Sequence, residues 1–265
     1  MKEPVTTRDV LPFLSRLTEE AGEVLLSYFN KSFRIDSKGG EATPIDIVTD
    51  ADRASEELIL QAIAREFPDH DVLAEETPPA LTGSQWLWIV DPLDGTVNFA
   101  HGLPLFCISI GLMYDNALVA GMIYDPLRRE SFFALRGEGA FLAGNRIKVS
   151  QADRLDRSLV ATGFPYDRGT APDNNLTEFA SVVTRVQGIR RAGSAALDLA
   201  YVAAGRLDGF WELKLKPWDM AAGMILVEEA GGRVSDRTGN PTDVHTYCVV
   251  ATNGRIHDPL LQLLT

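Results

Sequence analysis

Cysteine is scarce in this chain. Its 265 residues include two cysteines, Cys107 and Cys248, which lie far apart in the sequence and within apolar runs. This spacing argues against a disulfide framework and against a cysteine-rich zinc site, because both need several closely spaced thiols. We therefore expect reduced, packed thiols and a protein of the reducing cytoplasm.

Long apolar runs and an excess of positive charge are also missing. Strongly apolar stretches such as 220–227 fall far short of the ~20 residues that a membrane span needs, and Met1-Lys2-Glu3-Pro4 lacks the apolar core of a signal peptide. The 25 Lys and Arg residues stand against 37 Asp and Glu residues, a formal net charge of −12. Such a balance provides no broad cationic surface for nucleic acid or anionic lipid. We expect neither partner, and a polyanionic substrate would need a local cation.

Several common catalytic motifs are absent from the sequence. It has no Gly-x-Ser-x-Gly elbow and no Gly-Lys-Ser/Thr loop, and its four histidines form no His-Glu-x-x-His pair. The sequence therefore gives no support for a serine hydrolase or a P-loop NTPase. We interpret His101 as a loop or core histidine, and Arg190-Arg191 as a structural pair or dimer contact in preference to a second phosphate site.

The hydrophobic pattern predicts a mixed α/β protein. The chain length allows one large domain or two closely packed ones, and 45% hydrophobic residues suffice for an ordinary core. Apolar residues recur at helical spacing over 8–30 and 52–67, whereas 106–150 reads as an antiparallel meander. The other expected elements are short strands over 71–74, 86–90, 207–213 and 247–251, and helices over 176–186, 194–204, 218–230 and 259–264.

The chain carries no repeat, no low-complexity segment and no Pro/Ser-rich linker. We therefore expect one continuous body with a seam near Asp153. Residues 1–152 would form an N-terminal α+β part with metal-binding acids and the antiparallel sheet, and residues 153–265 a C-terminal α/β part that completes the site. The run Lys38-Gly39-Gly40-Glu41-Ala42-Thr43-Pro44 predicts a mobile loop, because two glycines and a proline interrupt the periodicity.

The most informative segment is Trp88-Ile89-Val90-Asp91-Pro92-Leu93-Asp94-Gly95-Thr96-Val97-Asn98-Phe99. A buried strand leads into Asp91, Pro92 should end its pairing, and Gly95-Thr96 can open a helix just after Asp94. Two carboxylates at one polar spot repel each other unless a hard cation lies between them, and Mg²⁺ accepts carboxylates and backbone carbonyls. A helix N-terminus beside that ion would bind phosphate. Taken alone, the motif is equally compatible with an Asp-Pro turn in which Asp94 caps a helix.

Three further acids lie at the ends of expected elements. Glu75 follows a short strand, Asp219 follows Trp218 at a helix start, and Asp52 opens a helix. Each of them alone is usually a helix cap or a solvated charge. Together with Asp91 and Asp94 they outline a two-metal site at one edge of a sheet.

With these motifs the chain resembles the inositol monophosphatase family over nearly its whole length. That family comprises metal-dependent phosphomonoesterases and includes archaeal-type fructose-1,6-bisphosphatases and nucleotide 3′-phosphatases. The resemblance implies a layered α/β (α+β) fold, an αβαβα sandwich of the inositol monophosphatase and fructose-1,6-bisphosphatase type. The segments that carry it are Asp46-Ile47-Val48-Thr49-Asp50-Ala51-Asp52, Ala74-Glu75-Glu76, Asp91-Pro92-Leu93-Asp94-Gly95-Thr96, Gly193-Ser194-Ala195-Ala196 and Lys216-Pro217-Trp218-Asp219-Met220-Ala221-Ala222-Gly223.

The resemblance also implies roles for individual residues. One Mg²⁺ would bind Glu75, Asp91 and the Leu93 carbonyl, a second would bind Asp91, Asp94 and Asp219, and a weaker third ion would touch Glu75. Asp52 would pair with Thr96 to orient the attacking water, so Asp52, Thr96 and Glu75 count as catalytic. The expected substrate contacts are Gly95 and Thr96 for the phosphate and Gly193, Ser194, Ala195, Glu212 and Asp219 for the rest of the molecule. Lys38 matches a loop lysine near the metals.

The activity implied is Mg²⁺-dependent, lithium-sensitive hydrolysis of a small phosphate monoester by metal-activated water. Val97-Asn98-Phe99 is similar to the inositol and broad sugar-phosphatase branch, so inositol-1-phosphate is the first expected substrate. Fructose-1,6-bisphosphate and NADP stay open as alternatives within the family, as does a regulatory binding protein with the same fold. We further expect a homodimer.

Overall fold

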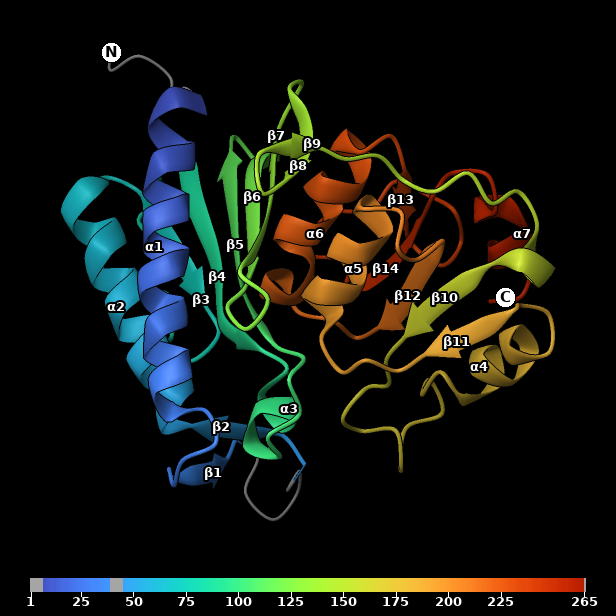
Figure 1. The fold of residues 1–265 in the computed structure, drawn as a ribbon, viewed down its shortest axis with the longest axis horizontal. Helices are drawn as coiled ribbons and strands as arrows, with labels where there is room; N and C mark the ends of the chain where they lie inside the picture. Colours follow the sequence, from blue (N-terminus) through green and yellow to red (C-terminus); the bar gives the residue numbers. More distant parts are fainter. Residues whose placement is uncertain (1–6, 39–44, 265) are drawn as a thin grey trace.

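The computed structural model describes residues 7–38 and 45–264 of the chain, so most of the expected mobile loop, 39–44, lies outside the described residues. Its elements stack in five layers (Figure 1). Helices α1 (Thr7–Tyr28) and α2 (Asp50–Glu66) cover a seven-stranded sheet, and helices α5 (Ala195–Ala203) and α6 (Pro217–Glu229) separate it from a five-stranded sheet. The outer layer contains α4 (Leu176–Val183) and α7 (His257–Leu261). This is the expected αβαβα sandwich.

The seven-stranded sheet follows the chain order from β3 to β9. Strands β3 (Asp71–Ala74) and β4 (Trp86–Asp94) are parallel, and every later pair is antiparallel, which confirms the predicted meander. The later strands are β5 (Cys107–Tyr114), β6 (Ala117–Asp125), β7 (Glu130–Leu135), β8 (Gly139–Leu142) and β9 (Asn145–Arg146). Pairing of β4 with β5 shifts between Asp91 and Asp94, because Pro92 has no N–H to donate. Pro92 therefore interrupts the strand but does not end it.

The five-stranded sheet has the order β11-β10-β12-β14-β13. Its strands are β10 (Leu159–Thr162), β11 (Gly188–Arg190), β12 (Gly209–Leu213), β13 (Arg233–Ser235) and β14 (Cys248–Thr252). The sequence analysis missed β10, β11 and β13, which have three or four residues and are too short for a visible alternation. It also missed the two-stranded sheet of β1 (Ile35–Ser37) and β2 (Ile47–Thr49).

Helix α6 belongs to the C-terminal half of the chain and packs against the sheet of the N-terminal half. It packs closely on the seven-stranded sheet, since a Cβ on Gly111 would lie 2.8 Å from the Ala221 side chain and one on Gly121 would lie 2.7 Å from Ile225. The Ser109 hydroxyl also donates to the Trp218 carbonyl, and Ser109 pairs with Asp91 across the sheet. This close packing brings the first turn of α6, with Asp219, to the carboxyl end of β4.

Two expectations from composition can be compared with the fold. Cys107 and Cys248 are both free thiols, and Cys107 is buried in the core. Within 7–38 and 45–264, no helix combines the length and the apolar character needed to cross a bilayer.

Candidate active site

The carboxyl end of β4 and the turn that follows it form the centre of the site. Asp91 is 2% exposed, and its Oδ1 accepts a hydrogen bond of 3.0 Å from the Leu93 amide. Gly95 has a φ of +94°, and a Cβ there would lie 2.9 Å from the Leu105 carbonyl oxygen. Only glycine fits this turn, which leads directly into the short helix α3 (Thr96–Ala100). The segment therefore combines acidic side chains with a helix N-terminus, as predicted.

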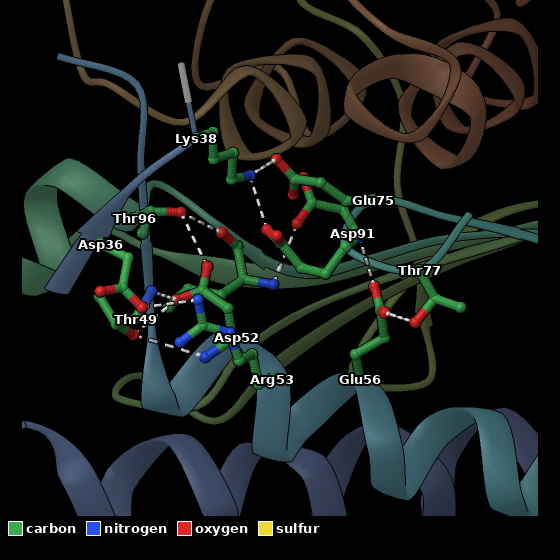
Figure 2. Close-up of polar contacts among 12 residues, drawn as sticks. Asp36, Lys38, Thr49, Asp52, Arg53, Glu56, Glu75, Thr77, Asp91 and Thr96 are labelled. Carbon is green, nitrogen blue, oxygen red and sulfur yellow. Dashed lines mark hydrogen bonds and ion pairs between the residues drawn. The ribbon is translucent and has the colours of Figure 1, made fainter. Parts of the chain in front are cut away.

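Glu75 lies beside Asp91 because β3 and β4 are parallel. Ala74 pairs with Val90, so the next residue of each strand emerges at the same sheet edge. The Glu75 and Asp91 side chains lie close together, and each affects the pKa of the other (Figure 2). Burial raises the pKa of Asp91 well above its usual value, and the negative charges of Glu75, Asp94 and Asp219 raise it further. The site is thus a dense group of acids that repel one another when ionised.

Lys38 supplies a positive charge to this group. Its Nζ lies 2.5 Å from Glu75 Oε1 and 2.6 Å from Glu76 Oε1 (Figure 2). Burial raises the pKa of the Glu75 carboxyl, and the Lys38 ammonium opposes that rise. The contact agrees with the predicted position of Lys38, near the acids that are expected to bind metal.

Asp52 reaches the site from the first turn of α2. The helix begins two residues before the predicted start because Thr49 is its N-cap: the Thr49 amide donates to Asp52 Oδ2 over 2.8 Å. The Thr96 hydroxyl lies 3.1 Å from Asp52 Oδ1 and 3.0 Å from the Leu93 carbonyl. Burial raises the pKa of Asp52 to about 6, although hydrogen bonds from Thr49 favour its ionised form. The predicted Asp52–Thr96 pair is therefore present.

Asp94 and Asp219 are held by residues of the C-terminal half. Asp94 Oδ2 accepts hydrogen bonds from the Ser194 hydroxyl at 2.5 Å and from the Ala196 amide at 2.8 Å. Asp219 is the third residue of α6, and its Oδ2 accepts from the Lys216 amide at 2.6 Å. Burial and the charges of Glu75 and Asp94 raise the pKa of Asp219 well above its usual value.

Glu212 lies on β12, at the other side of the site. Its carboxyl group rests against the backbone of Gly163, where a Cβ would lie 2.0 Å from either carboxyl oxygen. Burial raises the pKa of Glu212 to about 7, and the positive charge of Arg191 opposes that rise. Glu212 is thus a half-buried acid that lines the site.

Two neighbouring hollows, of about 510 and 380 Å³, join these residues into one cleft. The first is lined by Glu75, Asp91, Leu93, Asp94, Gly95, Thr96, Gly193 and Asp219, and the second adds Ala195 and Glu212. Asp52 and Ser194 are buried behind this surface, where their side chains hold Thr96 and Asp94. A direct contact of Ser194 with substrate therefore remains a prediction.

Sequence analysis did not assign several residues that line the cleft. Arg191 is exposed and borders both hollows, and His101 and Arg168 border the larger one. The position of Arg191 two residues before Gly193 was a usable signal, although we interpreted the arginine pair as structural. Arg168 and Tyr166 come from the segment after β10, in which no pattern points to a site.

The donor set fits Mg²⁺, which prefers carboxylate and carbonyl oxygens. Asp91 is buried and Asp94 and Asp219 are half-buried. Burial raises the pKa values of all three, so a cation among them would relieve an unfavourable arrangement. Within residues 7–38 and 45–264, no three His, Cys, Asp or Glu side chains are placed so that they could together hold a metal ion. Glu75 instead contacts Lys38. The ligand assignment therefore remains a prediction.

Comparison with known proteins gives close matches over most of the chain. An inositol-1-monophosphatase from Synechocystis sp. is 47% identical over 245 residues, which cover 92% of this chain and 84% of that relative. A protein named Nus factor SuhB from Pseudomonas aeruginosa is 44% identical over 252 residues, which cover 93% and 92%.

Solved structures agree with these sequence matches. The extragenic suppressor protein suhB from Bartonella henselae superposes with a TM-score of 0.90 at 41% identity, covering 97% of this chain and 98% of that chain. The inositol monophosphatase from Anabaena (Nostoc) sp. gives 0.87 at 43% identity, with 97% and 95% covered. The sequence model of one family, described as the inositol monophosphatase family, matches residues 7–265. A match of this extent means that the chain belongs to the inositol monophosphatase family.

Proposed function

We propose that this protein is a Mg²⁺-dependent phosphomonoesterase that hydrolyses inositol-1-phosphate or a similar small sugar phosphate. The observation that carries the proposal is the gathering of Glu75, Asp91, Asp94 and Asp219 in one cleft beside the start of α3. A binding surface for a neutral ligand would gain nothing from four neighbouring acids, whose charges raise the pKa values of Asp91 and Asp219. A reaction that uses divalent cations and a phosphate does require them.

The start of α3 would receive the phosphate. The first N–H groups of a helix have no partner within the helix, so the amides of Gly95 and Thr96 suit phosphoryl oxygens. Glu75, Asp91 and the Leu93 carbonyl would hold one Mg²⁺, and Asp91, Asp94 and Asp219 a second, with a weaker third near Glu75. When bound, these ions would lower the pKa of the attacking water and stabilise the leaving alkoxide.

Asp52 and Thr96 would orient the water. A Thr96 hydroxyl that donates to Asp52 has a lone pair left with which it can accept a hydrogen bond from water in the cleft. With a pKa of about 6, Asp52 is mostly ionised at neutral pH and can take up a proton that arrives through Thr96. Neither residue needs to form a bond to phosphorus.

The position of Glu212 supports the proposal that the substrate carries several hydroxyl groups. Its carboxyl group borders the second hollow and can accept hydrogen bonds from sugar or inositol hydroxyls. The Synechocystis relative is named for inositol-1-phosphate chemistry, which places that substrate first. Fructose-1,6-bisphosphate and NADP are the alternatives, and Arg191 at the cleft would suit their additional phosphate groups.

A panel of phosphate monoesters assayed with Mg²⁺ tests the proposal. We expect release of inorganic phosphate from inositol-1-phosphate with Mg²⁺, none in EDTA, and inhibition by Li⁺ at millimolar concentration. Equal phosphate release in EDTA would contradict the proposal. A preference for fructose-1,6-bisphosphate or NADP would keep the phosphatase and change its substrate.

A regulatory role is the second candidate, favoured by relatives named Nus factor SuhB at 44% and 40% identity. Such a protein would contact a macromolecular partner and need not turn over phosphate esters. Absence of turnover on the whole panel, from a folded protein that binds divalent cations, would favour this candidate.

A cytoplasmic location and a homodimer are also part of the phosphatase proposal. Light scattering of the purified protein measures the oligomeric state.

A further inference from the structure

Helix α2 presents a second buried acid to the site. Glu56 follows Asp52 by four residues, so both project from the same face of the helix. Asp52 is fully buried and Glu56 is 2% exposed. Figure 2 shows the two side chains rising from α2, Asp52 toward Thr96 and Glu56 toward Thr77. Asp52 holds Thr96, and neither the sequence motifs nor the proposed chemistry gives Glu56 a role.

Glu56 binds the chain directly after Glu75. Its Oε2 accepts a hydrogen bond of 2.8 Å from the Glu76 amide, and its Oε1 accepts one of 2.6 Å from the Thr77 hydroxyl (Figure 2). The Glu76 amide belongs to the peptide unit that begins at the Glu75 carbonyl carbon. A bond to that amide therefore restrains the backbone of Glu75 itself.

Strand pairing does not provide this restraint. The last paired residue of β3 is Ala74, so the backbone leaves the sheet at Glu75. The Lys38 ammonium contacts only the far end of the Glu75 side chain. The hydrogen bond from the Glu76 amide to Glu56 therefore restrains the backbone at Glu75. Through the backbone it also sets the direction in which the Glu75 side chain points.

An acid at this position is electrostatically unfavourable. Glu56 adds negative charge beside acids that already repel one another, and it raises the pKa of Glu76. Arg53, one turn earlier on α2, pairs with Asp36 and Asp50 instead of Glu56. A carboxylate is nevertheless suited to the contact, because its two oxygens accept from two donors at once. Glutamine would offer one acceptor and place an NH₂ against the other donor.

We propose that Glu56 is a positioning residue, which aims Glu75 into the cleft by binding the peptide unit that follows it. This inference rests on the proposed function, in which Glu75 is a metal ligand. Residues that orient metal ligands through hydrogen bonds commonly change metal affinity by tenfold or more when they are replaced. A residue that only ties α2 to the loop would change stability and leave metal affinity alone.

The test is the affinity of the purified protein for Mn²⁺, measured by titration calorimetry and by electron paramagnetic resonance. We expect Glu56→Gln to raise the Kd for Mn²⁺ about tenfold and to raise the Mg²⁺ concentration for half-maximal activity in parallel. The control is Glu57→Gln, which removes the same charge from the exposed neighbouring position and should match wild type. Melting temperatures of both variants show whether the fold is intact.

A Glu56→Gln protein with lowered melting temperature but wild-type Mn²⁺ affinity would overturn the inference. If Glu56→Gln does not fold, Thr77→Val decides, because it removes one donor and keeps the backbone hydrogen bond. It should raise the Kd about threefold, a smaller effect than the tenfold typical of losing a ligand-orienting residue, and an unchanged Kd would contradict the proposal. Absence of Mn²⁺ binding by wild-type protein would instead overturn the proposed function, so the two failures are distinguishable.

Discussion

The Ser194 hydroxyl donates a hydrogen bond of 2.5 Å to Asp94 Oδ2, a residue 100 positions earlier in the chain. The same hydroxyl oxygen accepts from the Leu197 amide at 3.2 Å and so caps α5. One side chain therefore joins the start of a helix in the C-terminal half to an acid at the end of β4. Both halves of the chain therefore contribute acids to the site.

Ser194→Ala should weaken both connections. Asp94 loses a donor that favours its ionised form, and α5 loses its N-cap, which together should lower the free energy of unfolding by about 1–2 kcal/mol. Mg²⁺ activation should also require a higher concentration, because the pKa of Asp94 rises. Urea unfolding and Mg²⁺ titration measure the two effects. The control is Ser27→Ala on the exposed face of α1, and equal results for both variants would refute the link.

Gly163→Ala should alter substrate choice without unfolding the protein. The three atoms nearest to a Cβ at this position all belong to the flexible end of the Glu212 side chain, so we expect the Glu212 carboxyl group to be displaced. Turnover of inositol-1-phosphate should fall at least as far as in Glu212→Ala, while turnover of a plain aryl phosphate stays near wild type. The ratio of kcat/KM values for the two substrates is the readout. Equal losses on both substrates would mean that Glu212 serves structure or metal binding.

His257 should make stability fall in acid. Its ring is fully buried between the Ser235 and Thr252 hydroxyls, at 2.8 and 2.9 Å, and burial lowers its pKa to about 4. The unfolded state has the ordinary His pKa of about 6.5 and binds more protons, so the stabilisation is complete above pH 6.5 and is lost as the pH falls toward 4. Between pH 7 and pH 5 the loss should be of order 2 kcal/mol.

Unfolding free energies at pH 7 and pH 5 in EDTA, for wild type and His257→Gln, isolate this contribution. The buried acids of the cleft act in the opposite direction, because their raised pKa values favour the folded state as the pH falls. Both proteins contain these acids, so the difference between their unfolding free energies removes the contribution of the acids. His245→Gln, at an exposed position, serves as control, and a wild-type pH dependence in His257→Gln would contradict this assignment.

Mg²⁺ should raise the melting temperature of the wild-type protein. The unfolded chain lacks the arranged acids, so binding favours the folded state by about 2.7 kcal/mol at a hundredfold excess over Kd. Asp91→Asn with Asp94→Asn should be at least as stable as wild type in EDTA and should scarcely respond to Mg²⁺. Asp153→Asn with Glu57→Gln removes two exposed acids as a control. An equal Mg²⁺ response in all three proteins would mean that the stabilising ion binds elsewhere.

Much of this site could be predicted because its residues lie at the ends of elements with clear patterns. Asp91 and Asp94 lie at the carboxyl end of a strongly apolar strand, and Asp219 lies in the first turn of a helix that begins at Pro217. The Thr49-x-x-Asp52 capping box was also visible in the sequence, although we began the helix at Asp52. In each case a local signal and a polar residue coincide.

The remaining features depend on contacts between segments that no local pattern connects. Glu56 reads as an ordinary polar residue of an amphipathic helix, and its role depends on where the chain turns after β3. Strands β10 and β11 are too short to show a period, yet β10 determines where Gly163 meets Glu212. The spacing of Arg191 from Gly193 indicates that the two residues are near each other, but it does not show that the Arg191 side chain borders the cleft.

The most direct test of the central claim is phosphate release by wild type and Asp91→Asn, measured across a Mg²⁺ titration. Asp91 is proposed to contact both ions, so its replacement removes two metal contacts at once while keeping the size of the side chain. We expect turnover of inositol-1-phosphate to fall by far more than tenfold, which exceeds about 1.4 kcal/mol of transition-state stabilisation, with the melting temperature in EDTA unchanged or higher. Turnover within about tenfold of wild type at the same Mg²⁺ concentration would contradict the account.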